Sequence, residues 1–137
     1  MQNMVQIVTF LRFDARKYPL SVACWIMILY LSFFTVPDTE ISQVPFIDKW
    51  AHIVMYGLTC LVMWVEYLLR HRRVNLRRML AMAVVLPILA SGAIEIVQEY
   101  CTGGRRSGDW LDLAANSLGV GLAAVTGFVY SYMRGKI

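Results

Sequence analysis

The sequence predicts an all-α protein, a bundle of four transmembrane helices in a single domain of 137 residues. Hydrophobic residues make up 58% of the chain, and they form long blocks rather than the short periodic runs of a soluble domain. A helix needs roughly 20 mainly apolar residues to cross about 30 Å of hydrocarbon. The blocks lack the alternation of a membrane β-barrel, so helices are expected. The expected spans are 19–36, 50–69, 79–100 and 111–133.

The first expected span, 19–36, contains no charged residue. Basic residues precede it, as they would precede a cleaved signal peptide. The apolar run is long for a signal, however, and Val36-Pro37-Asp38 follows it instead of a small-residue cleavage pattern. We therefore expect a retained span. The preceding segment, with Val5, Val8, Phe10, Leu11 and Phe13, suggests a short helix at the membrane surface.

The other three expected spans each carry a few ionisable groups. The second should begin just after Pro45, and apart from tyrosines it holds only His52 and Glu66. The third is apolar until Glu95, and Asp112 is the only charge in the fourth. The three cysteines form neither a redox motif nor a metal-binding spacing.

Positive charge predicts the orientation of the chain. Ten of the thirteen lysines and arginines fall on one side of the expected spans. They are Arg12, Arg16, Lys17, Arg70, Arg72, Arg73, Arg77, Arg78, Arg134 and Lys136. The loops are short, so the positive-inside rule places both termini and the arginine-rich loop in the cytoplasm. The basic surplus then fits anionic lipid headgroups, and no nucleic-acid partner is expected because no aromatic or sequence motif accompanies the arginines.

Three polar stripes lie at the opposite ends of the last three expected spans. They are Lys49, His52 and Tyr56; Glu95, Gln98 and Glu99; and Asp109, Asp112 and Asn116. Each stripe has helical spacing, which places most of its members on one helix face. Exposing such groups to lipid is costly, so we expect the stripes to converge at one depth and form a site.

The residue types suggest roles within that site. His52 suits proton transfer near neutral pH, with Glu95 and Asp112 as possible catalytic partners. Lys49 and Arg106 would bind an anion, the arginine with two hydrogen bonds. Further ligand contacts are expected from Tyr56, Gln98, Asp109 and Asn116. No compact set of metal ligands is present, so neither a metal nor another cofactor is expected.

Simpler interpretations remain open for several of these residues. Asp48 and Asp109 could be simple helix caps with no role in a site, and Lys49 could extend to the membrane surface. His52 and Tyr56 could be interfacial anchors, and Glu99 a solvated helix end. All the polar groups together could form a purely structural network. Glu66 is left outside the site, because pairing with Arg70 four residues later would account for it. Small residues such as Ala115, Gly119 and Ala123 suit close helix packing.

The combined motifs resemble the VanZ-like family of small bacterial membrane proteins. They are Asp48-Lys49-x-x-His52-x-x-x-Tyr56, Glu95-x-x-Gln98 and Arg106-x-x-Asp109-x-x-Asp112-x-x-x-Asn116-x-x-Gly119. The resemblance covers about 38–130. It implies a multi-pass protein of the bacterial inner membrane, and for the family's namesake low-level resistance to teicoplanin, but it implies no particular reaction.

Two functions are consistent with the site and the resemblance. The first is binding of a lipid headgroup, a lipid-linked envelope precursor or an amphiphilic drug such as a glycopeptide, or docking of another envelope protein. The alternative is a membrane enzyme that uses acid–base chemistry of His52 and Glu95 on a phospholipid or lipid-linked substrate.

Overall fold

The computed structural model describes residues 2–11, 14–34, 40–104 and 107–137, and within these ranges every regular element is a helix. The elements in chain order are α1 (Gln2–Leu11), η1 (Ala15–Lys17), α2 (Pro19–Phe33), η2 (Glu40–Gln43), α3 (Ile47–Arg70), α4 (Leu76–Leu80), η3 (Ala81–Val85), α5 (Leu86–Cys101) and α6 (Trp110–Met133). The all-α class is therefore confirmed.

Three helices are long and apolar enough to cross a membrane. They are Ile47–Arg70, Leu76–Cys101 and Trp110–Met133, the second formed by α4, η3 and α5 in continuous succession. These match three of the expected spans. The first expected span is represented by the shorter apolar helix α2, whose 15 residues extend about 22 Å.

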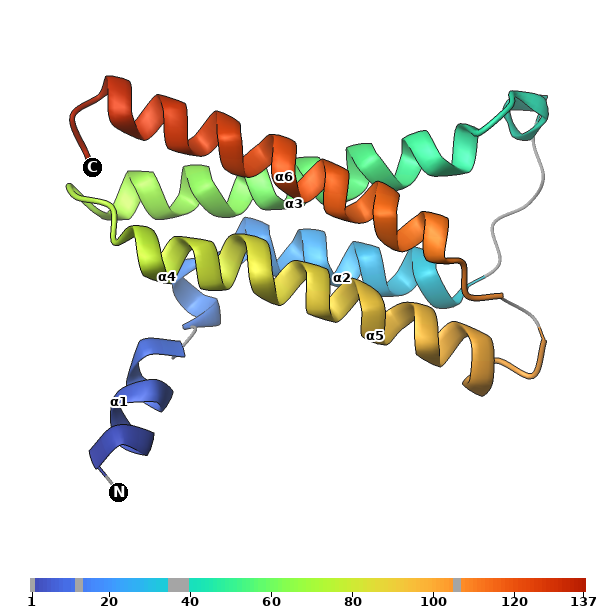
Figure 1. Ribbon diagram of the computed structural model, residues 1–137, viewed down its shortest axis with the longest axis horizontal. Helices are drawn as coiled ribbons and strands as arrows, with labels where there is room; N and C mark the ends of the chain where they lie inside the picture. Colours follow the sequence, from blue (N-terminus) through green and yellow to red (C-terminus); the bar gives the residue numbers. More distant parts are fainter. Residues whose placement is uncertain (1, 12–13, 35–39, 105–106) are drawn as a thin grey trace.

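The long helices and α2 lie side by side, whereas α1 diverges from them near one end (Figure 1). The loop between α3 and α4 and the C-terminus lie at that same end (Figure 1). We call it the arginine-rich end, after Arg70, Arg72, Arg73, Arg77 and Arg78. The segment η2 and the turn between α5 and α6 lie at the other end, which we call the carboxylate end after Asp48, Glu99 and Asp109.

Helices α3 and α6 form the main interface, because glycines let their backbones touch. A Cβ added to Gly119 would lie 2.9 Å from the backbone nitrogen of Gly57 and would collide with the carbonyl oxygen of Ile53. Further along, a Cβ on Gly127 would collide with the indole of Trp64. Small residues at a helix crossing permit such close approach. These contacts hold the two helices in one register.

Two clusters of buried apolar residues pack around α3. One lies toward the arginine-rich end and contains Tyr18, Met63, Trp64, Tyr67, Met79 and Ala83. The other contains Ile28, Tyr56, Cys60, Ile94, Val120 and Ala123. Both clusters join α3 to its neighbours, so α3 is the central helix of the bundle.

One turn of π-helix, η3, precedes a buried proline. Pro87 has no N–H, and in a regular helix its ring would crowd the carbonyl of Ala83 four residues earlier. The wider turn lets the N–H of Leu86 bond to the carbonyl of Ala81, five residues back. The helix therefore continues through the proline instead of ending there.

The start of α2 is held by the buried carboxylate of Glu66 on α3. The backbone N–H of Leu20 donates to it at 3.0 Å, and Ser21 donates through its backbone N–H at 2.9 Å and its hydroxyl at 2.6 Å. A helix N-terminus has free N–H groups and favours negative charge. Glu66 is therefore structural and outside the polar site, as expected, but its partner is α2 rather than Arg70.

Candidate functional site

The polar site is centred on Lys49, near the start of α3. Its ammonium group donates to Asp112 and lies 2.7 Å from Asp109 Oδ2 and 2.9 Å from Asp48 Oδ2. The lysine side chain is only 19% exposed, and that of Asp112 is 14% exposed. Three carboxylates from two helices thus surround one cation. Lys49 does not simply extend into the solvent.

His52, one turn further along α3, begins a chain of hydrogen bonds into the bundle. Its Nδ1 lies 2.9 Å from Asn116 Oδ1, and the Asn116 amide donates to the Ser91 hydroxyl at 2.6 Å. With Asn116 in this orientation, its oxygen can only accept a hydrogen bond, so Nδ1 of the His52 ring carries the hydrogen that it donates. The other ring nitrogen, Nε2, then lies 3.5 Å from Asp112 Oδ2.

Glu95 and Glu99 hold the turn that leads into α6. Glu99 accepts from the backbone N–H of Gly108, and Glu95 from that of Asp109, each at 2.9 Å. A Cβ at Gly108 would collide with the Glu95 carbonyl, so the turn can lie this close only with glycine there. Glu95 is thereby placed beside the cluster as predicted, while Glu99 is bonded to the turn rather than merely solvated.

Two predicted ligand residues are buried and make their contacts outside the Lys49 cluster. Tyr56 is almost fully buried, and its ring packs edge-on against Trp25 with centroids 6.1 Å apart. Gln98 is also buried, and its amide donates to the carbonyl oxygen of Ser32 on α2 at 2.7 Å. The structure therefore brings together Lys49, His52, Glu95, Asp109, Asp112 and Asn116. It places Tyr56 and Gln98 outside this group, in contacts with α2.

The structure distinguishes the two possible helix caps. Asp109 is the N-cap of α6 and accepts the N–H of Leu111 at 2.8 Å, while the same carboxylate binds Lys49. Asp109 therefore caps α6 and also belongs to the cluster around Lys49. The N-cap of α3, by contrast, is Phe46, and Asp48 instead pairs with Lys49.

Negative charge exceeds positive charge among the described residues of the cluster. Asp48, Asp109, Asp112 and Glu95 face one lysine and one histidine. The hydrogen bond from Lys49 lowers the pKa of Asp109 below its usual value, so that carboxyl stays ionised. Arg106, the other predicted anion ligand, lies outside the described residues, as does Arg105. Lys49 is already neutralised, so by itself it is a poor anion receptor.

Exposed aromatic residues lie at the same end of the bundle as the cluster. Trp50 and Trp110 each follow a member of the cluster in sequence, and Tyr100 lies in the last turn of α5 at the same end of the bundle. Their exposed fractions are 61%, 75% and 80%. Tryptophan and tyrosine gather where lipid headgroups meet hydrocarbon. The cluster therefore has exposed aromatic neighbours of the kind found at membrane surfaces.

Sequence reasoning missed some members of the network. Ser91, the inner partner of Asn116, lies four residues before Glu95, so continuing that polar stripe by one turn would have found it. Trp50 and Trp110 could have been found from the sequence, because each is an aromatic residue directly after a predicted site residue, Lys49 or Asp109. Among the described residues, no group of three or more His, Cys, Asp or Glu side chains could hold a metal ion.

Comparisons of the chain with protein-family models, with curated proteins and with solved structures find no match. Function is therefore inferred from the chemistry of the site.

Proposed function

We propose that the chain is a VanZ-like protein of the bacterial inner membrane that crosses the bilayer four times, with both termini in the cytoplasm. The three long apolar helices support a membrane location. The shorter α2 would serve as the first span. Polar groups beside its end at the carboxylate end of the bundle would then lie among the lipid headgroups. The positive-inside rule would place the arginine-rich end in the cytoplasm. The polar cluster would then face outward.

In this proposal the cluster binds the polar headgroup of an amphiphile in the outer leaflet. The observation that carries it is a partly exposed network of charged and hydrogen-bonding groups, bordered by exposed aromatic side chains on apolar helices. A molecule with a polar head and an apolar body would contact both parts at once. The candidates are a lipid, a lipid-linked envelope precursor or an amphiphilic drug such as a glycopeptide.

The surplus of carboxylates refines the expected headgroup. Carboxylates accept hydrogen bonds and attract cations, so Asp48 and Asp109, whose side chains are 62% and 40% exposed, suit hydroxyl or amine groups. A bare phosphate would be repelled by these residues unless Arg106 contributed. We therefore favour a sugar-bearing or amine-bearing headgroup.

Mass spectrometry of molecules that copurify with the protein tests this proposal. We expect the wild type to retain a discrete amphiphile and Lys49→Met/Asp112→Leu to lose it. The double variant removes a cation and its least exposed partner together, and the carboxylates of Asp48 and Asp109 that lose Lys49 are 62% and 40% exposed. Ser117→Ala is the control on α6, because the Ser117 hydroxyl donates within its own helix, to the carbonyl of Leu113. Identical bound molecules in all three folded proteins would contradict a binding role.

The orientation of His52 favours a second candidate function, acid–base catalysis on a lipid-linked substrate. With Nδ1 donating to Asn116, the neutral ring keeps Nε2 free to accept a proton, and Asp112 would stabilise the resulting charge. Glu95 is engaged by the turn, so Asp112 is the closer partner. If the protein is an enzyme, His52→Gln should still retain the bound molecule. Cells that carry this variant should, however, lack the lipid product that wild-type cells form. Loss of both, or of neither, would contradict catalysis.

A further inference from the structure

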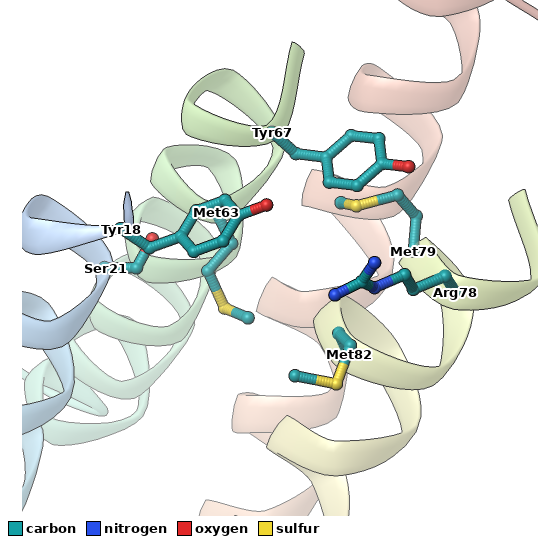
Figure 2. A pocket seen from close by; sticks show the side chains of 7 residues that line it. All are labelled: Tyr18, Ser21, Met63, Tyr67, Arg78, Met79 and Met82. Carbon is teal, nitrogen blue, oxygen red and sulfur yellow. The ribbon is translucent and has the colours of Figure 1, made fainter. Parts of the chain in front are cut away.

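A pocket lies at the arginine-rich end, away from the polar cluster. Figure 2 shows its lining side chains, which come from the start of α2, the end of α3 and the α4–η3 segment. They are Tyr18, Ser21, Met63, Tyr67, Arg78, Met79 and Met82. Arg78 extends from α4 into the space between Tyr18 and Met63 on one side and Tyr67 on the other (Figure 2). A guanidinium group thus projects into a pocket that methionines line.

A larger and more polar cavity adjoins this pocket and shares Tyr18 and Arg78 with it. Its volume is about 780 Å³, and its other lining residues are Asp14, Lys17, Leu69, Arg70 and His71. The volume falls within the range typical of small-molecule sites. Three permanent cations face one carboxylate, which itself lies 3.8 Å from the ammonium of Lys17. The cavity therefore carries a net positive charge.

The position of these cations matches a lipid headgroup in depth. Arg70 is the last residue of α3, Tyr18 directly precedes α2, and Arg78 lies in the first turns of the next long helix. The guanidinium of Arg70 also lies over the Tyr18 ring, 5.9 Å from its centroid. Apolar surface continues along the bundle from here, with Leu20, Leu69 and Leu80 all exposed. The phosphate of a phospholipid would meet these cations, and its two acyl chains would meet the exposed leucines.

We propose that this cavity binds the phosphate of an anionic phospholipid from the leaflet at the arginine-rich end. Arg70 and Arg78 would bind the phosphate oxygens, and Lys17 would add charge at the rim. The acyl chains would lie along the exposed leucines, while the methionine pocket, with room for about two waters in its 30 Å³, adapts around the glycerol end. This site is independent of the function proposed for the polar cluster.

A general attraction between basic loops and lipid is the main competing explanation, and the chain offers a matched control for it. Arg73 and Arg77 belong to the same basic segment and are exposed, but they do not line this cavity. Arg70→Gln/Arg78→Gln and Arg73→Gln/Arg77→Gln remove the same charge from the same end. Only the first pair should affect a specific site.

Native mass spectrometry of the detergent-purified full chain, titrated with phosphatidylglycerol or phosphatidylcholine, tests the proposal. We expect preference for phosphatidylglycerol, about thirtyfold weaker binding for Arg70→Gln/Arg78→Gln and less than about threefold for the control pair. Inorganic phosphate and deacylated glycerophosphoglycerol should fail to displace the lipid, because they lack the chains.

Three outcomes would overturn the proposal. They are equal losses in both double variants, equal binding of the two lipids, and displacement by free phosphate, which would indicate an anion site without lipid specificity. If Arg70→Gln/Arg78→Gln fails to fold, Lys17→Gln takes its place, because that side chain is 65% exposed at the rim. We expect it to weaken phosphatidylglycerol binding about fivefold, and an unchanged affinity would also overturn the proposal.

Discussion

Replacing Gly119 with alanine should separate the two helices that assemble the polar cluster. The new Cβ would lie 2.9 Å from the backbone nitrogen of Gly57, about 0.5 Å short of the 3.4 Å at which ordinary contact begins. It would also collide with the carbonyl oxygen of Ile53. Both obstacles are backbone atoms of α3, so no side-chain rotation can relieve them, and α6 must move away.

We expect Gly119→Ala to lower the free energy of unfolding by about 1–3 kcal/mol, the usual cost of overpacking. The measurement is equilibrium unfolding of purified protein in mixed micelles, followed by circular dichroism. Gly121→Ala is the control, because a Cβ at Gly121 meets nothing within 4 Å. Alanine is also the better helix former by roughly 1 kcal/mol, so the control should be neutral or slightly stabilising. Equal stability of the two variants would refute the proposed contact between α3 and α6.

Two further predictions concern single carboxylates. Glu66→Ala should lower the free energy of unfolding by about 1–3 kcal/mol, because it leaves the N–H groups of Leu20 and Ser21 without their partner. Thermal unfolding should show this loss, and it should show none for the control Glu40→Ala, whose side chain is on the surface. Equal losses in the two variants would contradict the capping role of Glu66. Asp109 has a lowered folded-state pKa, so its contribution to stability is present above the usual value of 3.8 and disappears as the pH falls through the lowered pKa. Asp109→Asn should therefore lose less stability than the wild type on acidification, and identical acid profiles would contradict the Lys49–Asp109 pairing.

Helical periodicity in the sequence predicted much of the fold and the cluster. It gave three long apolar helices and the faces that carry Lys49 with His52 and Asp112 with Asn116, which the structure places in contact. Periodicity identifies a face but not the helix it meets. Gln98 lies only about 60° from Glu95 around the helix, and yet its amide meets Ser32 on α2 instead of the cluster.

Other features depend on contacts between distant segments. Glu66 had a plausible local partner in Arg70, but the N-terminus of α2, 45 residues away in sequence, offers three donors. The deep Asn116–Ser91 bond likewise joins α6 to α5, and neither residue is ionisable. Such partners follow from the way each pair of helices packs, which the apolar pattern alone does not determine.

The central claim is that the register of α3 and α6 builds a headgroup-binding site, and site-specific photo-crosslinking in cells tests it most directly. A benzophenone amino acid would replace Trp110, which is exposed beside Asp109, or Leu122, which is exposed further along α6. We predict a discrete amphiphile adduct at position 110 that disappears in Lys49→Met/Asp112→Leu, and only bulk lipid adducts at position 122. The same adducts at both positions, unchanged in the double variant, would contradict the claim.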